Sequence, residues 1–288
     1  MPTTRSYLIC ATPRSGSTLL CEALENTGIA GNPKEYFEAL RATGLPRRPK
    51  EYFTGLEDQE IMNLLGDFSR IDLASLPPSQ TYASYTEYLA HVLVEGTTSN
   101  GIFGAKVMWG YFDDFISNLR DLPEGGEKPV PELLASIFPD LHYIRVSRLD
   151  KVRQAVSLWK AIQTYTWRED EPSSFVDQQV DGVHEPQKHV LHFHFQAIDY
   201  LIQQIEEHER AWQRYFDEAA IRPFSVIYED LSANYEETAL QILEYLNIPI
   251  PAQPVFAQRR MKRQSNALSE EWVERYHLIK QGQMDAVS

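Results

Sequence analysis

Several features are scarce or missing in this chain of 288 residues, and each shortage excludes a class of protein. Only two cysteines occur, Cys10 and Cys21, so we expect no structural disulfides and two buried thiols in a reducing compartment. No run of about 18 apolar residues exists, so no membrane-spanning helix is expected. The apolar run at 7–11 is too short for a signal peptide and Arg14 follows it closely, so we predict a cytoplasmic protein.

Positive charge is scarce as well. The chain has 27 Lys and Arg against 41 Asp and Glu, which gives a net charge of −14 with His counted as neutral. This balance argues against nucleic acid or acidic lipid as a partner. An anionic ligand would therefore need a few well-placed arginines, lysines and backbone amides.

What is present is the composition of an ordinary globular protein, with 43% hydrophobic and 24% charged residues. Hydrophobic patterning predicts strands at 6–11, 101–109, 141–146 and 223–228. The same patterning predicts helices at 17–26, 85–95, 150–167, 187–216, 232–246 and 269–280, with Ser232 as an N-cap. Strands that alternate with long helices indicate the α/β class, with a central, mainly parallel β-sheet flanked by helices. We expect a single domain over 1–288, with loop-rich insertions around 29–55 and 168–190.

The stretch "ATPRSGSTLL" at 11–20 joins the first strand to the first helix. A loop in that place gathers free backbone N–H groups at the positive end of the helix dipole. Gly16 allows a close approach of the backbone to an oxyanion, and Arg14 and the hydroxyls add donors. A phosphate cradle is therefore favoured over the alternative, a polar turn with a good N-cap.

The loop lacks the Gly-Lys-Ser/Thr of a nucleoside triphosphatase, in which the lysine contacts the terminal phosphates and the hydroxyl binds a metal ion. It also fails the pattern of a cysteine phosphatase, because Cys10 and Arg14 are too close in sequence to surround one phosphate. The sequence thus predicts an anion site that uses no metal.

Two further stretches follow strands. In "IRVSRLDKVRQAVSLWKA" at 144–161, Arg148 and Ser157 suit a second phosphate, because ligands bind at the strand ends of open α/β sheets. Arg153 and Lys160 lie near Ser157 at helical spacings, and a solvated helix with Arg–Asp pairs is an equal alternative. "YEDL" at 228–231 is a strand-to-helix turn whose acids could orient neighbouring loops.

In this order the three stretches resemble sulfotransferases that use 3′-phosphoadenosine 5′-phosphosulfate (PAPS). The chain also resembles the bacterial trehalose 2-sulfotransferase family. The similarity lies in "GNPKEYF" at 31–37, "GAKVMW" at 104–109, "QAVSLWKAIQTYTWR" at 154–168 and "SEEWVERY" at 269–276. It covers residues from about 5 to 276, and it implies a P-loop-like sulfotransferase fold.

The resemblance implies a donor site bound without metal. The 5′-phosphosulfate would be held by Arg14, Ser15, Gly16, Ser17 and Thr18, the 3′-phosphate by Arg148 and Ser157, and a late loop would add Lys262 and Arg263.

The resemblance also implies an acceptor site in which Glu35 is the general base. A sugar hydroxyl is a poor nucleophile at neutral pH, so a carboxylate must take its proton as the new bond forms. Lys106 matches the family lysine, which would support the sulfuryl group or the loop; a buried lysine paired with an acid is an equal alternative. Pro13 stands where the family carries a polar, substrate-facing residue. The residues implied to line the acceptor pocket are Pro13, Asn32, Pro33, Lys34, Glu35, Tyr36, Phe37, Glu38, Tyr52 and Lys106.

The resemblance therefore implies in-line transfer of a sulfuryl group from PAPS to a hydroxyl of a carbohydrate or glycolipid, with a trehalose-like acceptor and, by analogy, a homodimer. The alternatives are a P-loop kinase that uses ATP and a non-catalytic nucleotide-binding protein. His189, His192 and His194 do not share one helix face at their spacings, so we predict no metal site there.

Overall fold

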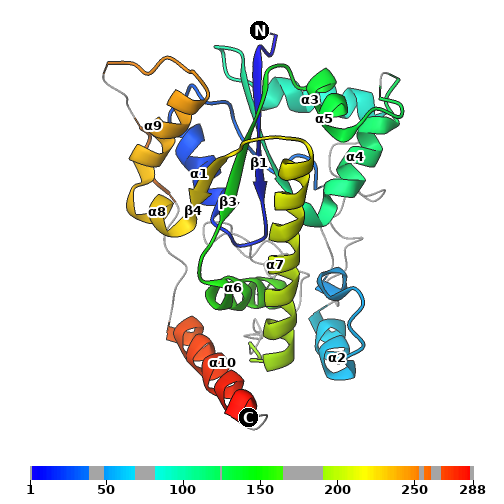
Figure 1. The fold of residues 1–288 in the computed structure, drawn as a ribbon, viewed down its shortest axis with the longest axis vertical. Coiled ribbons are helices and arrows are strands. Elements are labelled where there is room, and N and C mark those ends of the chain that lie inside the picture. Colours follow the sequence, from blue (N-terminus) through cyan, green and yellow to red (C-terminus); the bar gives the residue numbers. More distant parts are fainter. Residues whose placement is uncertain are drawn as a thin grey trace, which may run out of the picture. The chain divides into compact units, whose positions relative to one another are not determined.

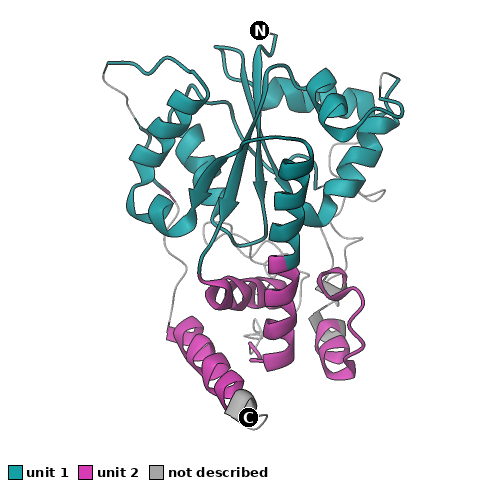
Figure 2. Cartoon of the chain, in the orientation of Figure 1, with its two compact units in different colours: residues 1–46, 77–149, 207–259 teal, residues 47–76, 150–206, 260–288 magenta. Residues whose placement is uncertain are grey.

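The computed structural model describes residues 2–38, 49–68, 82–123, 125–164, 191–252, 256–260 and 267–285. The chain divides into two compact units, coloured in Figure 2. Unit 1 comprises residues 1–46, 77–149 and 207–259, and unit 2 comprises residues 47–76, 150–206 and 260–288. Each unit combines segments that are far apart in sequence. The single domain expected over 1–288 stays a prediction.

Unit 1 is built on a parallel sheet of four strands in the order β2-β1-β3-β4 (Figure 1). The strands are β1 (Arg5–Ala11), β2 (Ile102–Met108), β3 (Leu141–Ser147) and β4 (Phe224–Ile227). β1 lies in the centre, where Ser6 pairs with both Phe103 and Leu141. Residues 6–11 of this strand are buried, as its apolar sequence requires of a strand covered on both faces. The α/β class and the parallel sheet are confirmed.

Helices cover both sides of these strands, with α1, α8 and α9 on one side and α4, α5 and α7 on the other (Figure 1). Trp212 on α7 donates its indole N–H to the carbonyl of Ala11 at 3.0 Å, which fixes this helix against the end of β1. The helices with residues in unit 1 are α1 (Ser17–Glu25), α3 (Tyr85–Glu95), η3 (Trp109–Tyr111), α4 (Phe112–Arg120), α5 (Val130–Ile137), residues 207–218 of α7 (Phe195–Glu218), α8 (Tyr228–Ala233) and α9 (Tyr235–Tyr245).

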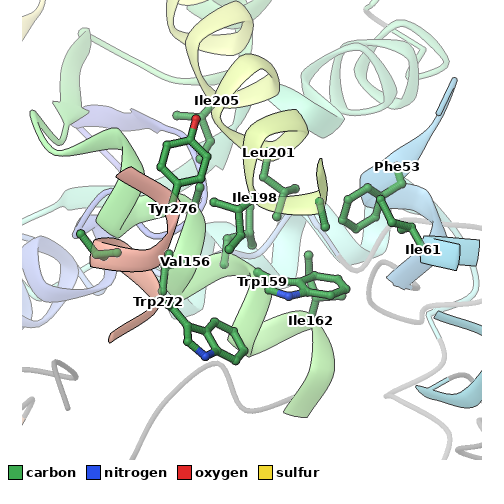
Figure 3. Packing of buried hydrophobic residues seen from close by; sticks show 14 of the residues in the cluster. Phe53, Ile61, Val156, Trp159, Ile162, Ile198, Leu201, Ile205, Trp272 and Tyr276 are labelled. Atoms are coloured by element: carbon green, nitrogen blue, oxygen red, sulfur yellow. The ribbon is translucent and has the colours of Figure 1, made fainter. Parts of the chain in front are cut away.

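Unit 2 is helical and has a hydrophobic core of its own (Figure 3). Its elements are η1 (Pro49–Phe53), α2 (Gln59–Phe68), α6 (Lys151–Thr164), residues 195–206 of α7, and α10 (Ala267–Asp285). Trp159 is fully buried at the centre of this core, and the Phe53 ring meets it edge-on at a centroid distance of 5.8 Å. Among the described residues, no helix is long and apolar enough to cross a membrane.

Some predicted helix boundaries are wrong, and α10 extends to Asp285 where the predicted end was residue 280. Residues 191–194 are not helical and α7 begins at Phe195, because the side chain of Gln163 bonds both the N–H and the carbonyl of His192. His194 then caps the helix, its Nδ1 accepting from the N–H of Ala197 at 3.3 Å. Ser232 is not an N-cap, because it lies inside α8 and Asn234 precedes α9.

Candidate active site

The loop between β1 and α1, the predicted anion cradle, turns sharply before the helix. Arg14 and Gly16 both have positive φ angles, 61° and 91°, which produce this turn. Gly16 is the N-cap residue of α1 and provides no side-chain cap, so the alternative of a turn with a good N-cap is wrong. Ser15 is fully buried and its Oγ has no hydrogen-bond partner among the described residues. An unsatisfied buried hydroxyl beside uncapped helix amides fits a phosphosulfate ligand.

Tyr228 connects this loop to the end of β3. A Cβ added to Gly16 would lie 2.4 Å from Cδ2 of Tyr228, so the glycine backbone rests directly on the tyrosine ring. The guanidinium of Arg148 stacks on the same ring, 4.6 Å from its centroid. Glu229 accepts a hydrogen bond from the N–H of Leu149 at 3.1 Å. The acid of "YEDL" therefore does orient a neighbouring loop, and its tyrosine, which sequence reasoning missed, joins the two predicted phosphate-binding stretches.

On α6, in unit 2, the neighbours of Ser157 are engaged with other side chains. Arg153 pairs with Asp150 at 2.9 Å and with Glu270 of α10, and Lys160 donates to Ser269 at 2.8 Å. The Arg–Asp pair of the alternative interpretation is thus present. Ser157 is half-buried and belongs to unit 2, whereas Arg148 belongs to unit 1, so their joint binding of one phosphate stays a prediction.

Several predicted residues lie outside the described part of the chain. These are Lys262, Arg263, His189 and the insertion at 168–190. Tyr52 is described and belongs to unit 2, where it packs against the core. No group of His, Cys, Asp or Glu that could hold a metal ion occurs among the described residues.

The segment that carries Glu35 is fixed to the free edge of β2. The N–H of Lys106 donates to the carbonyl of Lys34 at 2.9 Å, and Lys34 forms a parallel bridge with Ala105. Gly31, at φ 79°, lies so close to Gly104 that an added Cβ would be 2.8 Å from the Gly104 nitrogen. Backbone contacts therefore determine where Glu35 sits.

The side chain of Lys106 joins the Glu35 carboxylate to the donor loop. Its Nζ lies 2.6 Å from Oε2 of Glu35 and donates to Oγ1 of Thr18 at 3.2 Å. Burial would lower the pKa of Lys106, but its interactions with Glu35, Cys21 and Glu38 together outweigh burial, and the pKa is raised. The lysine is therefore an ammonium. Lys106 is a buried lysine paired with an acid, as one interpretation held. That acid is the predicted base, so the pair is also compatible with the other interpretation, a lysine that supports the site.

A second donor to Glu35, Tyr111, was not predicted. Its hydroxyl donates to Oε1 of Glu35 at 3.1 Å. Burial, followed by the charges of Glu35 and Glu38, raises the pKa of Tyr111 well above its usual value, so the phenol keeps its proton. The sequence contains 15 tyrosines, and nothing in the local pattern separates this one from the others.

The other predicted acceptor residues near Glu35 make contacts within unit 1. Asn32 donates through Nδ2 to the carbonyl of Glu95 at 3.0 Å, and Lys34 pairs with the Glu95 carboxylate at 2.8 Å. Phe37 is buried against Phe115, with ring centroids 4.3 Å apart. Their role in acceptor binding stays a prediction, as does that of Pro13, Pro33, Tyr36 and Glu38.

Residues 6–278 match the model of the Stf0 sulphotransferase family, which is nearly the whole chain. The chain belongs to this family. It is 33% identical over 276 residues to the trehalose 2-sulfotransferase of Mycolicibacterium smegmatis, and 34% identical over 274 residues to that of Mycobacterium tuberculosis. Each alignment covers 94% of this chain and 94% of the relative. The sulfotransferase domain from the curacin biosynthetic pathway is 13% identical, with a TM-score of 0.44, and covers 93% of this chain and 83% of that one.

Family membership confirms the resemblance drawn from the motifs, and the protein is a sulfotransferase with a sulfotransferase fold. It disfavours both alternatives, the ATP-dependent kinase and the non-catalytic nucleotide-binding protein. The transfer reaction predicted from the motifs needs a donor loop and an acceptor base close together. In this structure Lys106 contacts both.

Proposed function

We propose that this sulfotransferase moves the sulfuryl group of PAPS to a hydroxyl of a trehalose-like carbohydrate, with Glu35 as the general base. One observation carries the proposal. A single buried ammonium, that of Lys106, lies 2.6 Å from the carboxylate of Glu35 and 3.2 Å from the hydroxyl of Thr18 in the donor loop. An acceptor hydroxyl at Glu35 would therefore be next to an anion held in that loop.

The donor supplies an activated sulfuryl group, and the chain supplies positive charge and hydrogen bonds. Arg14, the amides at the start of α1 and the hydroxyls of Ser15, Ser17 and Thr18 would bind the 5′-phosphosulfate. Fixed donors of this kind stabilise charge that develops on a departing phosphate oxygen. Lys262 and Arg263 would add contacts to the donor from the late loop.

Glu35 accepts the proton of the acceptor hydroxyl as the new oxygen–sulfur bond forms and the bond from sulfur to the 5′-phosphate oxygen breaks. Its Oε2 accepts from Lys106 and its Oε1 from Tyr111, and each carboxylate oxygen has a further lone pair that can receive the proton. In-line transfer in this arrangement needs no covalent enzyme intermediate. Positioning and electrostatic stabilisation are then the main catalytic effects.

The acceptor is proposed from the relatives, since both curated relatives carry the name trehalose 2-sulfotransferase. The segment from Asn32 to Glu38 would face the sugar, and Tyr52 would stack on a ring face. Pro13 cannot donate a hydrogen bond, so any acceptor group near it must be satisfied elsewhere. A glycolipid that carries the same sugar is a second acceptor of this class. The homodimer and the cytoplasmic location stay predictions.

The test uses labelled PAPS, trehalose and a panel of related disaccharides and glycolipids. The Glu35→Gln variant should lower kcat by about a hundredfold or more, because general-base catalysis is worth that much, and leave the KM for PAPS within about twofold. Glu132→Gln, on the exposed side of α5, is the matched control and should keep kcat within about twofold.

Two results would contradict the proposal at different levels. If Glu35→Gln keeps full turnover, the carboxylate is not the base. If the wild-type protein does not bind adenosine 3′,5′-bisphosphate, the donor is wrong as well.

A further inference from the structure

The phenol of Tyr111 lies in a place where it touches the proposed base and nothing of the donor loop that the structure describes. The residue ends η3, the short turn that directly follows β2. Its side chain is buried, and its hydroxyl has two acceptors within reach, Oε1 of Glu35 at 3.1 Å and the carbonyl of Lys106 at 3.5 Å. A phenol has one proton to donate, and a charged acceptor at the shorter distance takes it. Tyr111 is thus a neutral, fixed donor to the Glu35 carboxylate.

The two donors to Glu35 differ in kind. Lys106 is a compact charge on a flexible stem of four carbons, which attracts a carboxylate without fixing its direction. Tyr111 adds no charge, but its ring is buried and its O–H direction is set by the ring. The carboxylate is therefore neutralised by the lysine and oriented by the tyrosine.

When the donor is bound, Lys106 would have a second anion within reach, the sulfuryl group. Its ammonium already contacts Thr18, so an anionic sulfuryl group in the donor loop would attract it away from Oε2 of Glu35. A carboxylate held by the lysine alone would then be free to rotate. The hydrogen bond from Tyr111 to Oε1 does not depend on the donor and would persist.

We propose that Tyr111 is a positioning residue for the transfer reaction: it holds Glu35 in the orientation that meets the acceptor hydroxyl when Lys106 turns toward the donor. This inference rests on the proposed role of Glu35 as the base. The competing explanation is a core tyrosine whose hydroxyl bonds the nearest acceptor, which would affect stability and not the rate of transfer.

The variant Tyr111→Phe removes one oxygen and keeps the ring. We expect kcat to fall about tenfold, the loss typical of one hydrogen bond to a charged group, with the KM for PAPS unchanged within about twofold. Tyr143→Phe is the matched control. Tyr143 is equally buried on β3, and its hydroxyl contacts that of Tyr215 at 3.2 Å instead of Glu35. The control should keep kcat within about twofold.

A double variant separates positioning from a general loss of activity. In the Glu35→Gln background, single-turnover transfer from labelled PAPS should fall by less than about twofold when Tyr111→Phe is added, because two residues that act as one unit are not additive. A tenfold loss in that background, or equal kcat for Tyr111→Phe and Tyr143→Phe, would overturn the inference. Full activity of Glu35→Gln would contradict the proposed role of Glu35 as the base. A slow Glu35→Gln together with a fully active Tyr111→Phe would contradict only the positioning role of Tyr111.

Binding of adenosine 3′,5′-bisphosphate, followed by thermal shift, checks that each variant is folded. If Tyr111→Phe does not fold, Glu35→Asp tests the same hydrogen bond by changing its acceptor. Shortening the side chain by one methylene withdraws the carboxylate from the phenol, so kcat should fall by a similar factor at unchanged KM for PAPS. Full kcat in Glu35→Asp would contradict the proposal.

Discussion

Replacing Gly16 with alanine should damage the donor loop in a way that the structure makes quantitative. The new Cβ would lie 2.4 Å from Cδ2 of Tyr228, where ordinary contact begins at 3.4 Å, so the atoms must separate by 1.0 Å (3.4 − 2.4). Because the Arg148 guanidinium stacks on that ring, 4.6 Å from its centroid, a shift of the ring displaces the arginine too. Gly28→Ala is the matched control, since Gly28 also has a positive φ, 69°, but no atom within 4 Å of an added Cβ.

The two variants share one energetic effect and differ in the other. An L side chain at positive φ costs about 1–2 kcal/mol at either position. Overpacking against Tyr228 adds about 1–3 kcal/mol at Gly16 only. At about 2 °C per kcal/mol for a chain of this size, we expect Tm to fall by about 4–10 °C for Gly16→Ala and by about 2–4 °C for Gly28→Ala.

Thermal unfolding and titration with adenosine 3′,5′-bisphosphate measure both consequences. Gly16→Ala should also weaken bisphosphate binding by about tenfold, the contribution of one charge-assisted contact. Combined with Tyr228→Ala, the same substitution should cost only the backbone strain, because the ring is gone. Equal Tm values for the two alanine variants, or an undiminished cost in the Tyr228→Ala background, would show that the ring does not set the position of the loop.

Two further predictions concern unit 2 and the thiols. Asp199 accepts from Tyr276 at 2.6 Å and from Lys280 at 2.7 Å; burial alone would raise its pKa, but these bonds outweigh burial and the pKa is lowered. The stability that this network adds is therefore present above the Asp pKa of the unfolded chain, about 4, and is lost as the pH falls through the folded pKa. Asp199→Asn should lower Tm at pH 7 and make Tm decline less steeply in acid. Curves of Tm against pH that run parallel for the variant and the wild type would contradict this. Cys10 and Cys21 are buried, and burial raises the pKa of Cys10, so a colorimetric thiol reagent should react with neither until denaturant is added; rapid reaction in the native protein would be contrary evidence.

The strands could be predicted closely because each is a short apolar run between loops, and all four lie within two residues of their predicted ends. Helix α4 was missed although its sequence carries the signal: its buried residues are Phe112, Phe115, Ile116 and Leu119, at helical spacing. The start of α7 could not be predicted. It depends on the contacts of Gln163 with the backbone of His192, which are tertiary and leave no trace in local periodicity.

The candidate site also contains residues that local sequence could predict and residues that it could not. The anion cradle proposed at 12–18 followed from a strand, a glycine and a helix start, all of which are local. Glu35 followed only from the family resemblance, since one glutamate among many carries no local mark. Tyr111 and Tyr228 could not be predicted, because their contacts with Glu35 and Gly16 join segments more than 70 residues apart. Long-range contacts of this kind exist only once the sheet has formed.

The way in which residues 31–35 are attached to β2 bears on how the acceptor specificity of such an enzyme can change. The contacts with β2 itself are made by main-chain atoms and by the close approach of Gly31 to Gly104, while the side chains of Asn32 and Lys34 add contacts with Glu95. Because the contacts with β2 are main-chain ones, we expect a replacement at Pro33 or Lys34 to leave the Glu35 carboxylate in place. We therefore expect that new acceptors can be acquired by point replacement beside the proposed base, and that a laboratory redesign can vary the same positions provided that both glycines are retained.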